Sequence, residues 1–275
     1  MKTNLLPIYT ATAIEEAPIA GGSTYPCLMS VDIGNGEQKK YVVKILKQTT
    51  LQEYFPIHSE VIASILAREF DLFTPDIALI QVPSFFIHEL CEKPPYQKSK
   101  NELIAGVYFG SEYIEGAEDV TSKQIEQWED IDELQTIFAF DMLIQNTDRR
   151  QGKPNSFMKD EYFYLIDHEL SLNTNKLASY DATLSANLAE QHLLYPFLNS
   201  LPKKIGLKFD SFRYYLRQLD PNVIDNYILQ LNNILKEKNE YDATDLLYDD
   251  HTLTNYLYQI KNNPTYFIQE LQLIL

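Results

Sequence analysis

The sequence predicts an α+β protein with a strand-rich N-terminal part and a helical C-terminal part. Seven of the nine glycines lie before residue 120, where they mark turns between short apolar runs. The second half instead shows apolar residues at helical spacing, with prolines at the breaks. The composition, 45% hydrophobic and 12% aromatic, is typical of a chain that buries a core.

In the N-terminal part, two strands are expected over residues 25–32 and 40–46. They flank the Gly-Asn-Gly segment 34–36, and Asn-Gly between apolar runs is a strong hairpin signal. Residues 56–70 carry apolar side chains at helical spacing, with a proline in the first turn. We therefore expect this part to be mostly sheet with one well-marked helix. Two further apolar runs, expected as strands, cover residues 77–82 and 103–113.

In the C-terminal part the pattern changes to long helices. Residues 131–144 are so apolar that the helix they predict must be buried nearly all round. Residues 146–155 interrupt every periodicity and are expected to form a loop. Two short strands joined by a tight hairpin follow, over residues 156–158 and 162–166. The remainder, residues 177–275, predicts several amphipathic helices separated at prolines.

The charge balance limits the possible partners. The chain has 39 acidic and 23 basic residues and a net charge of −16, so it lacks the basic footprint of a nucleic-acid binder. Cys27 and Cys91 are too few for a disulfide framework and form no Cys-x-x-Cys pair. We find neither a signal-peptide stretch nor a membrane-spanning apolar window. We expect a soluble, cytoplasmic protein that binds no membrane and, by itself, no nucleic acid.

Lys44 stands inside an apolar strand, and alternation places it on the same face as Val42 and Leu46. An ammonium group on such a face needs a partner anion, unless the strand is an edge strand whose lysine faces solvent. Glu60 lies in the first half of the expected helix, clear of its large apolar side chains. A strand lysine and a helix glutamate can pair, which is how kinases hold the phosphates of a nucleotide.

Three further polar features are candidates for a site. The glycine-rich turn at residues 21–24 would let backbone N–H groups approach a phosphate, although taken alone it reads better as an ordinary turn. The loop 146–155 combines a carboxylate with cations and amides. Asp167 ends an apolar strand, and a carboxylate in that position after an Asn-bearing loop suits a hard cation near phosphates. A capped turn explains each feature singly but not their order.

The order of these features resembles that of a known fold. The residues that carry the likeness are Asn146-x-Asp148-Arg149, Lys153-Pro154-Asn155 and Leu165-Ile166-Asp167-His168. This sequence pattern resembles that of the HipA-like kinases. These are bacterial relatives of the HipA toxin, which is a serine/threonine kinase with a protein-kinase-like fold. The resemblance covers roughly residues 15 to 175. It implies a two-lobed fold, with an N-lobe over residues 1–110 and a helical C-lobe over residues 111–275.

The resemblance also implies ATP and Mg²⁺ as cofactors, and transfer of the γ-phosphoryl group to a hydroxyl, with a protein serine or threonine as the expected acceptor. By the same resemblance, Lys44 would hold the α- and β-phosphates, with Glu60 as its partner. Asp148 would be the base that orients the acceptor hydroxyl. Asn155 and Asp167 would coordinate magnesium. A regulatory protein partner and membership of a toxin–antitoxin pair belong to the same expectation.

The resemblance assigns two more groups and shows departures from the kinase pattern. Asn155 lies seven positions after Asp148, whereas protein kinases place it five after, and Asp-Phe-Gly is replaced by Asp167-His168-Glu169. Two alternatives stay open: a small-molecule kinase, and a degenerate kinase-like module that binds a nucleotide or a partner without turnover. The phosphates would be covered by Gly21, Gly22 and Ser23, and the hinge touching adenine would be Glu112, Tyr113 and Ile114.

Overall fold

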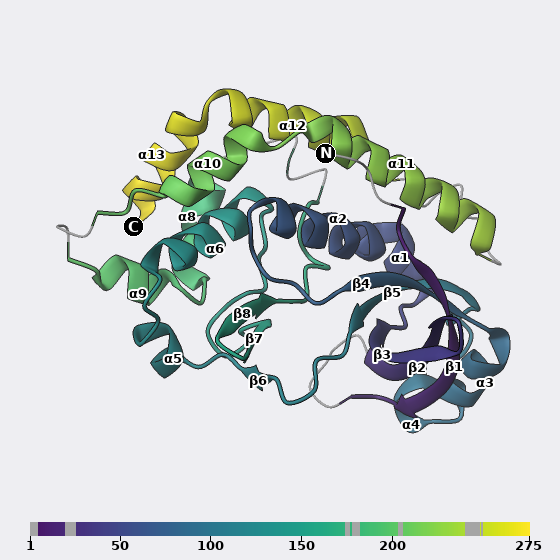
Figure 1. Cartoon of the computed structure of the whole chain (residues 1–275). Helices are drawn as coiled ribbons and strands as arrows, with labels where there is room; N and C mark the ends of the chain where they lie inside the picture. The colour runs from purple at the N-terminus through teal and green to yellow at the C-terminus, as the bar shows by residue number, and fades with distance from the viewer. Residues whose placement is uncertain are drawn as a thin grey trace.

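The protein is mixed α+β, with the sheet in its N-terminal part and most helices in its C-terminal part, as predicted (Figure 1). The computed structural model describes residues 5–19, 26–173, 177, 182–202, 206–239, 248 and 250–275. In Figure 1 the first strands curl together at one end, and the last helices arch over helix α2. No helix among these residues has the length and apolar character needed to cross a bilayer.

Five N-terminal strands close into a barrel in the order β1-β2-β3-β5-β4. The predicted hairpin around residues 34–36 is confirmed, because β2 and β3 pair antiparallel up to Gly34 and Glu37. The sequence did not predict β1, whose side chains are mostly exposed or half-buried, nor the closure that its parallel pairing with β4 produces. The strands are β1 (Ile8–Glu16), β2 (Pro26–Gly34), β3 (Glu37–Lys44), β4 (Ile77–Val82) and β5 (Gly106–Glu112).

The N-terminal part contains more helix than predicted. The expected helix is α2 (Pro56–Glu69), but α1 (Gln48–Tyr54), α3 (Ser84–Cys91) and α4 (Pro94–Gln97) accompany it. The expectation of a single helix was therefore wrong. These three helices have at most 8 residues each, too short to show a hydrophobic period in the sequence.

The C-terminal part follows the predicted order. Helix α6 (Ile131–Leu143) is buried at every position from Leu134 to Leu143, as its composition indicated. Next comes the predicted hairpin of β7 (Ser156–Lys159) and β8 (Tyr162–Leu165). The other elements are β6 (Glu118–Asp119), α5 (Ser122–Glu126), α8 (Ala182–Gln191), α9 (Tyr195–Ser200), α10 (Asp210–Gln218), α11 (Pro221–Lys238), α12 (Asp250–Asn262) and α13 (Pro264–Ile274).

Helix α2 is held between the barrel and the C-terminal helices, with α11 packed along it (Figure 1). His58 on α2 bonds through Nε2 to Oδ1 of Asn232 on α11 at 2.7 Å, and its ring stacks on Tyr248. Ser59 donates to the carbonyl of Ser171 at 2.8 Å. These contacts hold helix α2 against α11 and against the segment that follows β8.

Candidate active site

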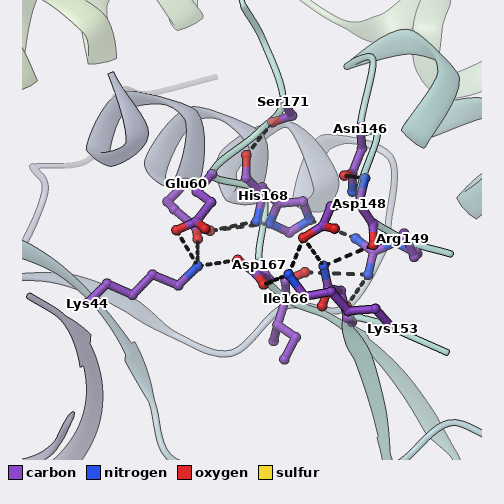
Figure 2. A network of polar contacts seen from close by, with 12 residues as sticks. Lys44, Glu60, Asn146, Asp148, Arg149, Lys153, Ile166, Asp167, His168 and Ser171 are labelled. Atoms are coloured by element: carbon purple, nitrogen blue, oxygen red, sulfur yellow. Dashed lines mark hydrogen bonds and ion pairs between the residues drawn. The ribbon is translucent and has the colours of Figure 1, made fainter. Parts of the chain in front are cut away.

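Lys44, at the end of β3, is the centre of the first of two polar clusters (Figure 2). Its Nζ forms ion pairs with Glu60 of α2 and with Asp167, which follows β8. A third carboxylate, that of Glu169, lies 3.2 Å from the same nitrogen. The predicted pairing of Lys44 with Glu60 is thus confirmed, and the edge-strand alternative is excluded because the Lys44 side chain is only 12% exposed.

The carboxylates outweigh the effect of burial on this cluster. Burial alone would lower the pKa of Lys44, but the charges of the three carboxylates raise it above its usual value. Burial would raise the pKa of Asp167, yet Lys44 and Lys153 lower it to about 2. In Glu169 burial prevails, and the neighbouring Asp167 and Glu60 add to it, so its pKa is raised. The cluster therefore carries more carboxylate than its single lysine balances.

Asp148 and Asn155 form the second cluster, in the loop between α6 and β7. The amide nitrogen of Asn155 lies 3.1 Å from Oδ2 of Asp148, although seven positions separate them in the sequence. Lys153 forms an ion pair with Asp148, and its Nζ also lies 3.3 Å from Oδ2 of Asp167. Lys153 thereby joins the two clusters, because it contacts Asp148 on one side and Asp167 on the other (Figure 2).

The loop is held from behind by Asp141, a fully buried carboxylate on α6. Asp141 accepts hydrogen bonds from Arg149 Nε at 2.6 Å and from Asn146 Nδ2 at 3.0 Å, and His192 Nε2 lies 2.9 Å away. Burial would raise the pKa of Asp141, but Arg149 and His192 hold it well below its usual range. Asp141 therefore braces the loop that carries Asp148.

Residues of both clusters line one cavity of about 350 Å³ between the barrel and the β7–β8 hairpin, namely Lys44, Glu60, Asp167, Lys153 and Asn155. Apolar side chains from both parts of the chain, Val42, Phe109 and Leu165, form one side of it. Ser64, 3% exposed and one turn after Glu60 on α2, also lines it. The cavity thus combines an apolar surface with a strongly charged end, as a site for a nucleotide requires.

A second cavity, of about 360 Å³, lies near the N-terminus of α6 and is lined by carboxylates. Four of these carboxylates, Asp71, Asp130, Asp132 and Glu133, have structural partners. Asp130 caps α6 through the N–H of Glu133, Glu133 accepts from the indole of Trp128, and Asp71 accepts from Tyr215. We therefore place the candidate site in the cavity that contains Lys44.

Three groups of residues need separate mention. Gly21, Gly22 and Ser23 lie outside the described residues. The expected hinge residues Glu112, Tyr113 and Ile114 do not line the cavity, whereas Phe109 and Ser111 of β5 do. Sequence reasoning gave no role to Lys153, Glu169 or His168. All three stand next to, or two residues from, a predicted ligand, and this proximity was the available signal.

A strand lysine paired to a helix glutamate, beside an Asp-and-Asn loop and a strand-end aspartate, is the arrangement of the kinase class. The chain belongs to the HipA-like kinase family, whose profile matches residues 18–205. No curated protein matches the chain. Among solved structures, the crystal structure of the Helicobacter pylori proinflammatory kinase CtkA is similar, at 12% identity over 99% of this chain and 100% of that chain, with a TM-score of 0.49.

Proposed function

We propose that the protein is an ATP- and magnesium-dependent phosphotransferase that passes the γ-phosphoryl group to a hydroxyl. The observation that carries this proposal is the convergence of Lys44, Asn155 and Asp167 on one cavity, with Asp148 in contact with two residues of its lining, Asn155 and Lys153. Phosphoryl transfer needs positioning and charge neutralisation more than covalent chemistry from the protein. The family match supports a kinase. The residues of the cavity can both position a nucleotide and neutralise its charge.

In this proposal residues 1–110 form the N-lobe and residues 111–275 the C-lobe of a kinase-like arrangement. Lys44 binds the α- and β-phosphates, and Glu60 keeps its ammonium group directed into the cavity. The apolar side of the cavity takes the base. The segment Glu112–Ile114, which does not itself line the cavity but directly follows the lining residues Phe109 and Ser111, is the proposed hinge. Gly21, Gly22 and Ser23 cover the phosphates.

The residues proposed as magnesium ligands fit that ion. Asp167 offers carboxylate oxygens, and Asn155 offers an amide oxygen because its amide nitrogen is turned to Asp148. Carboxylate and amide oxygens are the ligands that Mg²⁺ takes from proteins near phosphates. A bound Mg²⁺ would neutralise phosphate charge and offset the surplus carboxylate charge that Lys44 leaves. Asp167 and Asn155 would hold it.

Asp148 is proposed as the base for the acceptor hydroxyl. Its carboxylate is 7% exposed and is held by Lys153 and Asn155, which line the cavity. With an acceptor bound, Asp148 would orient the hydroxyl and take its proton as the oxygen attacks the γ-phosphorus. Lys153 lies where a cation would meet the phosphoryl oxygens during transfer.

The contact between Asp148 and Asn155 supports turnover rather than a degenerate binding module. The loop is two residues longer than in protein kinases, yet it folds so that both side chains meet, 3.1 Å apart. Within it, Arg150 and Lys153 exchange two backbone hydrogen bonds of 3.0 Å each. The two additional residues lie in this turn, so the side chains of Asp148 and Asn155 still meet.

The expected acceptor is a protein serine or threonine, with a small molecule as the alternative. A regulatory partner and a toxin role also belong to the proposal. Comparing the phosphoproteomes of cells that express the wild type and Asp148→Ala would identify the acceptor. New phosphoserine or phosphothreonine sites that depend on Asp148 are expected. A change confined to small metabolites would favour the alternative.

Two substitutions test the assigned roles. Asp148→Asn is expected to reduce transfer by about 10²- to 10⁴-fold and to leave magnesium–ATP affinity nearly intact, because a base acts mainly in the transition state. Asp167→Asn is expected to remove both transfer and the magnesium-dependent part of ATP binding. The measurement is calorimetric titration with ATP, with and without Mg²⁺, alongside a transfer assay.

Asp160→Asn is the matched control. Asp160 is 78% exposed in the β7–β8 turn, so neither binding nor transfer should change. Loss of binding in Asp148→Asn together with intact binding in Asp167→Asn would reverse the two roles. Absence of ATP binding by the wild type would contradict the proposed function.

A further inference from the structure

His168 lies directly after Asp167 and contacts Glu60 of the first cluster and Arg149 of the Asp148 loop (Figure 2). It is 1% exposed. Its backbone N–H donates to Oε2 of Glu60 at 3.0 Å, and its ring Nε2 lies 3.2 Å from Nη2 of Arg149. One residue thus connects the glutamate that pairs with Lys44 to the arginine that holds the Asp148 loop.

The chemistry of Arg149 fixes the state of the ring. A guanidinium group can only donate, so Nε2 of His168 must accept, and a neutral ring then carries its proton on Nδ1. Nδ1 has no hydrogen-bond partner among the described residues, and the nearest carboxylate oxygen, Oε2 of Glu60, is 3.7 Å away. The contact with Arg149 is therefore what distinguishes this ring from an apolar side chain of similar size.

The guanidinium group of Arg149 is held by other contacts as well. It donates through Nε to Asp141 at 2.6 Å and through Nη1 to the backbone carbonyl of Asn155. All of its guanidinium group is buried. Because its position is fixed from two sides, Arg149 is a rigid anchor for whatever it bonds with Nη2, which is the ring of His168.

Asp167 needs such an anchor because of its backbone. Its φ is +61°, in the left-handed region, which is uncommon for non-glycine residues although aspartate enters it more readily than most. On one side, the N–H of Ile166 donates to the carbonyl of Asn155 at 3.0 Å. On the other, the carbonyl of His168 accepts from Ser171 N at 2.9 Å and from its Oγ at 2.7 Å. The direction of the Asp167 carboxylate thus depends on how firmly His168 is held.

We propose that His168 is a positioning residue for Asp167. Its N–H, held by Glu60, and its ring, held by Arg149, fix the left-handed turn that directs the Asp167 carboxylate into the cavity. His168 acts through Asp167 and not on a reacting atom. This inference rests on the proposed magnesium role of Asp167 and adds the residue that makes that role possible.

Two polar variants separate the ring contact from simple packing. In His168→Gln the side-chain oxygen reaches the position of Nε2, whereas in His168→Asn it reaches only that of Nδ1. We expect His168→Gln to keep most of the gain in ATP affinity that Mg²⁺ provides. We expect His168→Asn to lose about 10- to 100-fold of magnesium affinity, the usual effect of removing a residue that orients a metal ligand. Calorimetric ATP titrations at increasing Mg²⁺ measure both, without relying on turnover.

Magnesium-free ATP binding and a distant histidine provide the controls. Magnesium-free binding depends on Lys44 and should change little in either variant. His58→Leu removes a buried histidine of α2 that lies outside the cavity; it should lower the melting temperature but leave the magnesium-dependent gain intact.

The outcomes separate this inference from the proposed function. A wild type without any magnesium-dependent gain would overturn both. A normal wild type with a full gain in His168→Asn, or with equal losses in both His168 variants, would overturn only the positioning role.

Discussion

The cluster around Lys44 and the network of contacts around Asp141 are both buried, but they differ in charge balance and in what they face. Asp141 is fully buried and is bonded to Arg149, His192 and Asn146. Lys44 faces the cavity and meets three carboxylates with one ammonium group. A matched network in the interior holds the fold, whereas an unmatched one at a cavity has capacity left for a ligand.

The difference also appears in how the two networks are built. The Asp141 network joins α6 to the loop that follows it and to His192, so it holds the loop in place. The Lys44 cluster joins β3, α2 and the segment after β8, which come from both parts of the chain. A ligand that binds Lys44 therefore contacts both parts at once.

The largest expected effect on stability comes from Asp141→Ala. It leaves the buried Arg149 without its charge partner, and breaking such a pair costs about 3–5 kcal/mol. Urea denaturation should show this loss in the free energy of unfolding. As a control, Asp160→Asn removes only an exposed charge and keeps a residue suited to the left-handed backbone there, so it should change stability by less than about 0.5 kcal/mol. A loss in Asp141→Ala as small as in this control would mean that the Asp141 network does not hold the fold.

Lys44→Met should show the opposite balance between stability and activity. Its carboxylate partners face a cavity that admits water, and burial already raises the pKa of Glu169, so the surplus charge can be relieved by protonation. We expect a smaller loss of stability than in Asp141→Ala, but a loss of transfer of about 10²- to 10³-fold, as when a charge-stabilising donor is removed. Denaturation and a transfer assay on the same preparations measure both. Normal transfer by folded Lys44→Met would contradict the proposed role.

His58, which anchors the helix that carries Glu60, predicts a pH dependence. Burial lowers the pKa of His58 to about 4, although its bond to Asn232 partly opposes this. Because the unfolded chain takes up this proton near pH 6.5 and the folded protein does not, stability should fall as the pH drops below 6.5. The expected loss is on the order of 2 kcal/mol between pH 7 and pH 5. Urea denaturation at several pH values measures it.

His58→Leu supplies the control for this pH dependence. The variant should be less stable at pH 7, and the part of the slope between pH 7 and pH 5 that belongs to His58 should be absent. An unchanged slope would show that other groups cause the pH dependence.

The smallest effect is expected at the exposed pair of Lys39 and Glu112, whose atoms lie 2.9 Å apart at 36% and 27% exposure. Such pairs contribute about 0–1 kcal/mol, so Glu112→Gln should barely change the melting temperature. ATP affinity should also persist, because a hinge contacts a base through its backbone. A large loss of affinity would give the Glu112 side chain a direct role.

The sequence by itself determined the local elements and the chemistry of the candidate site. Alternation and the Asn-Gly turn gave β2 and β3, helical spacing gave α2, and continuous apolar character gave the buried α6, because each of these signals is local. Lys44, Glu60 and Asp167 stood out because polar groups beside apolar runs need partners, whereas Asp148 and Asn155 were assigned by the resemblance to HipA-like kinases.

Only the tertiary structure decided how these pieces close around a cavity. Pairing of β1 with β4 closes the barrel between segments more than 60 residues apart, and a mostly exposed strand carries no signal of such a partner. The roles of Lys153, Glu169 and His168 likewise depend on distances of 3.2 to 3.7 Å between segments remote in the chain. Spacing along a sequence specifies which faces are buried, but contacts across the fold depend on how all the elements pack together.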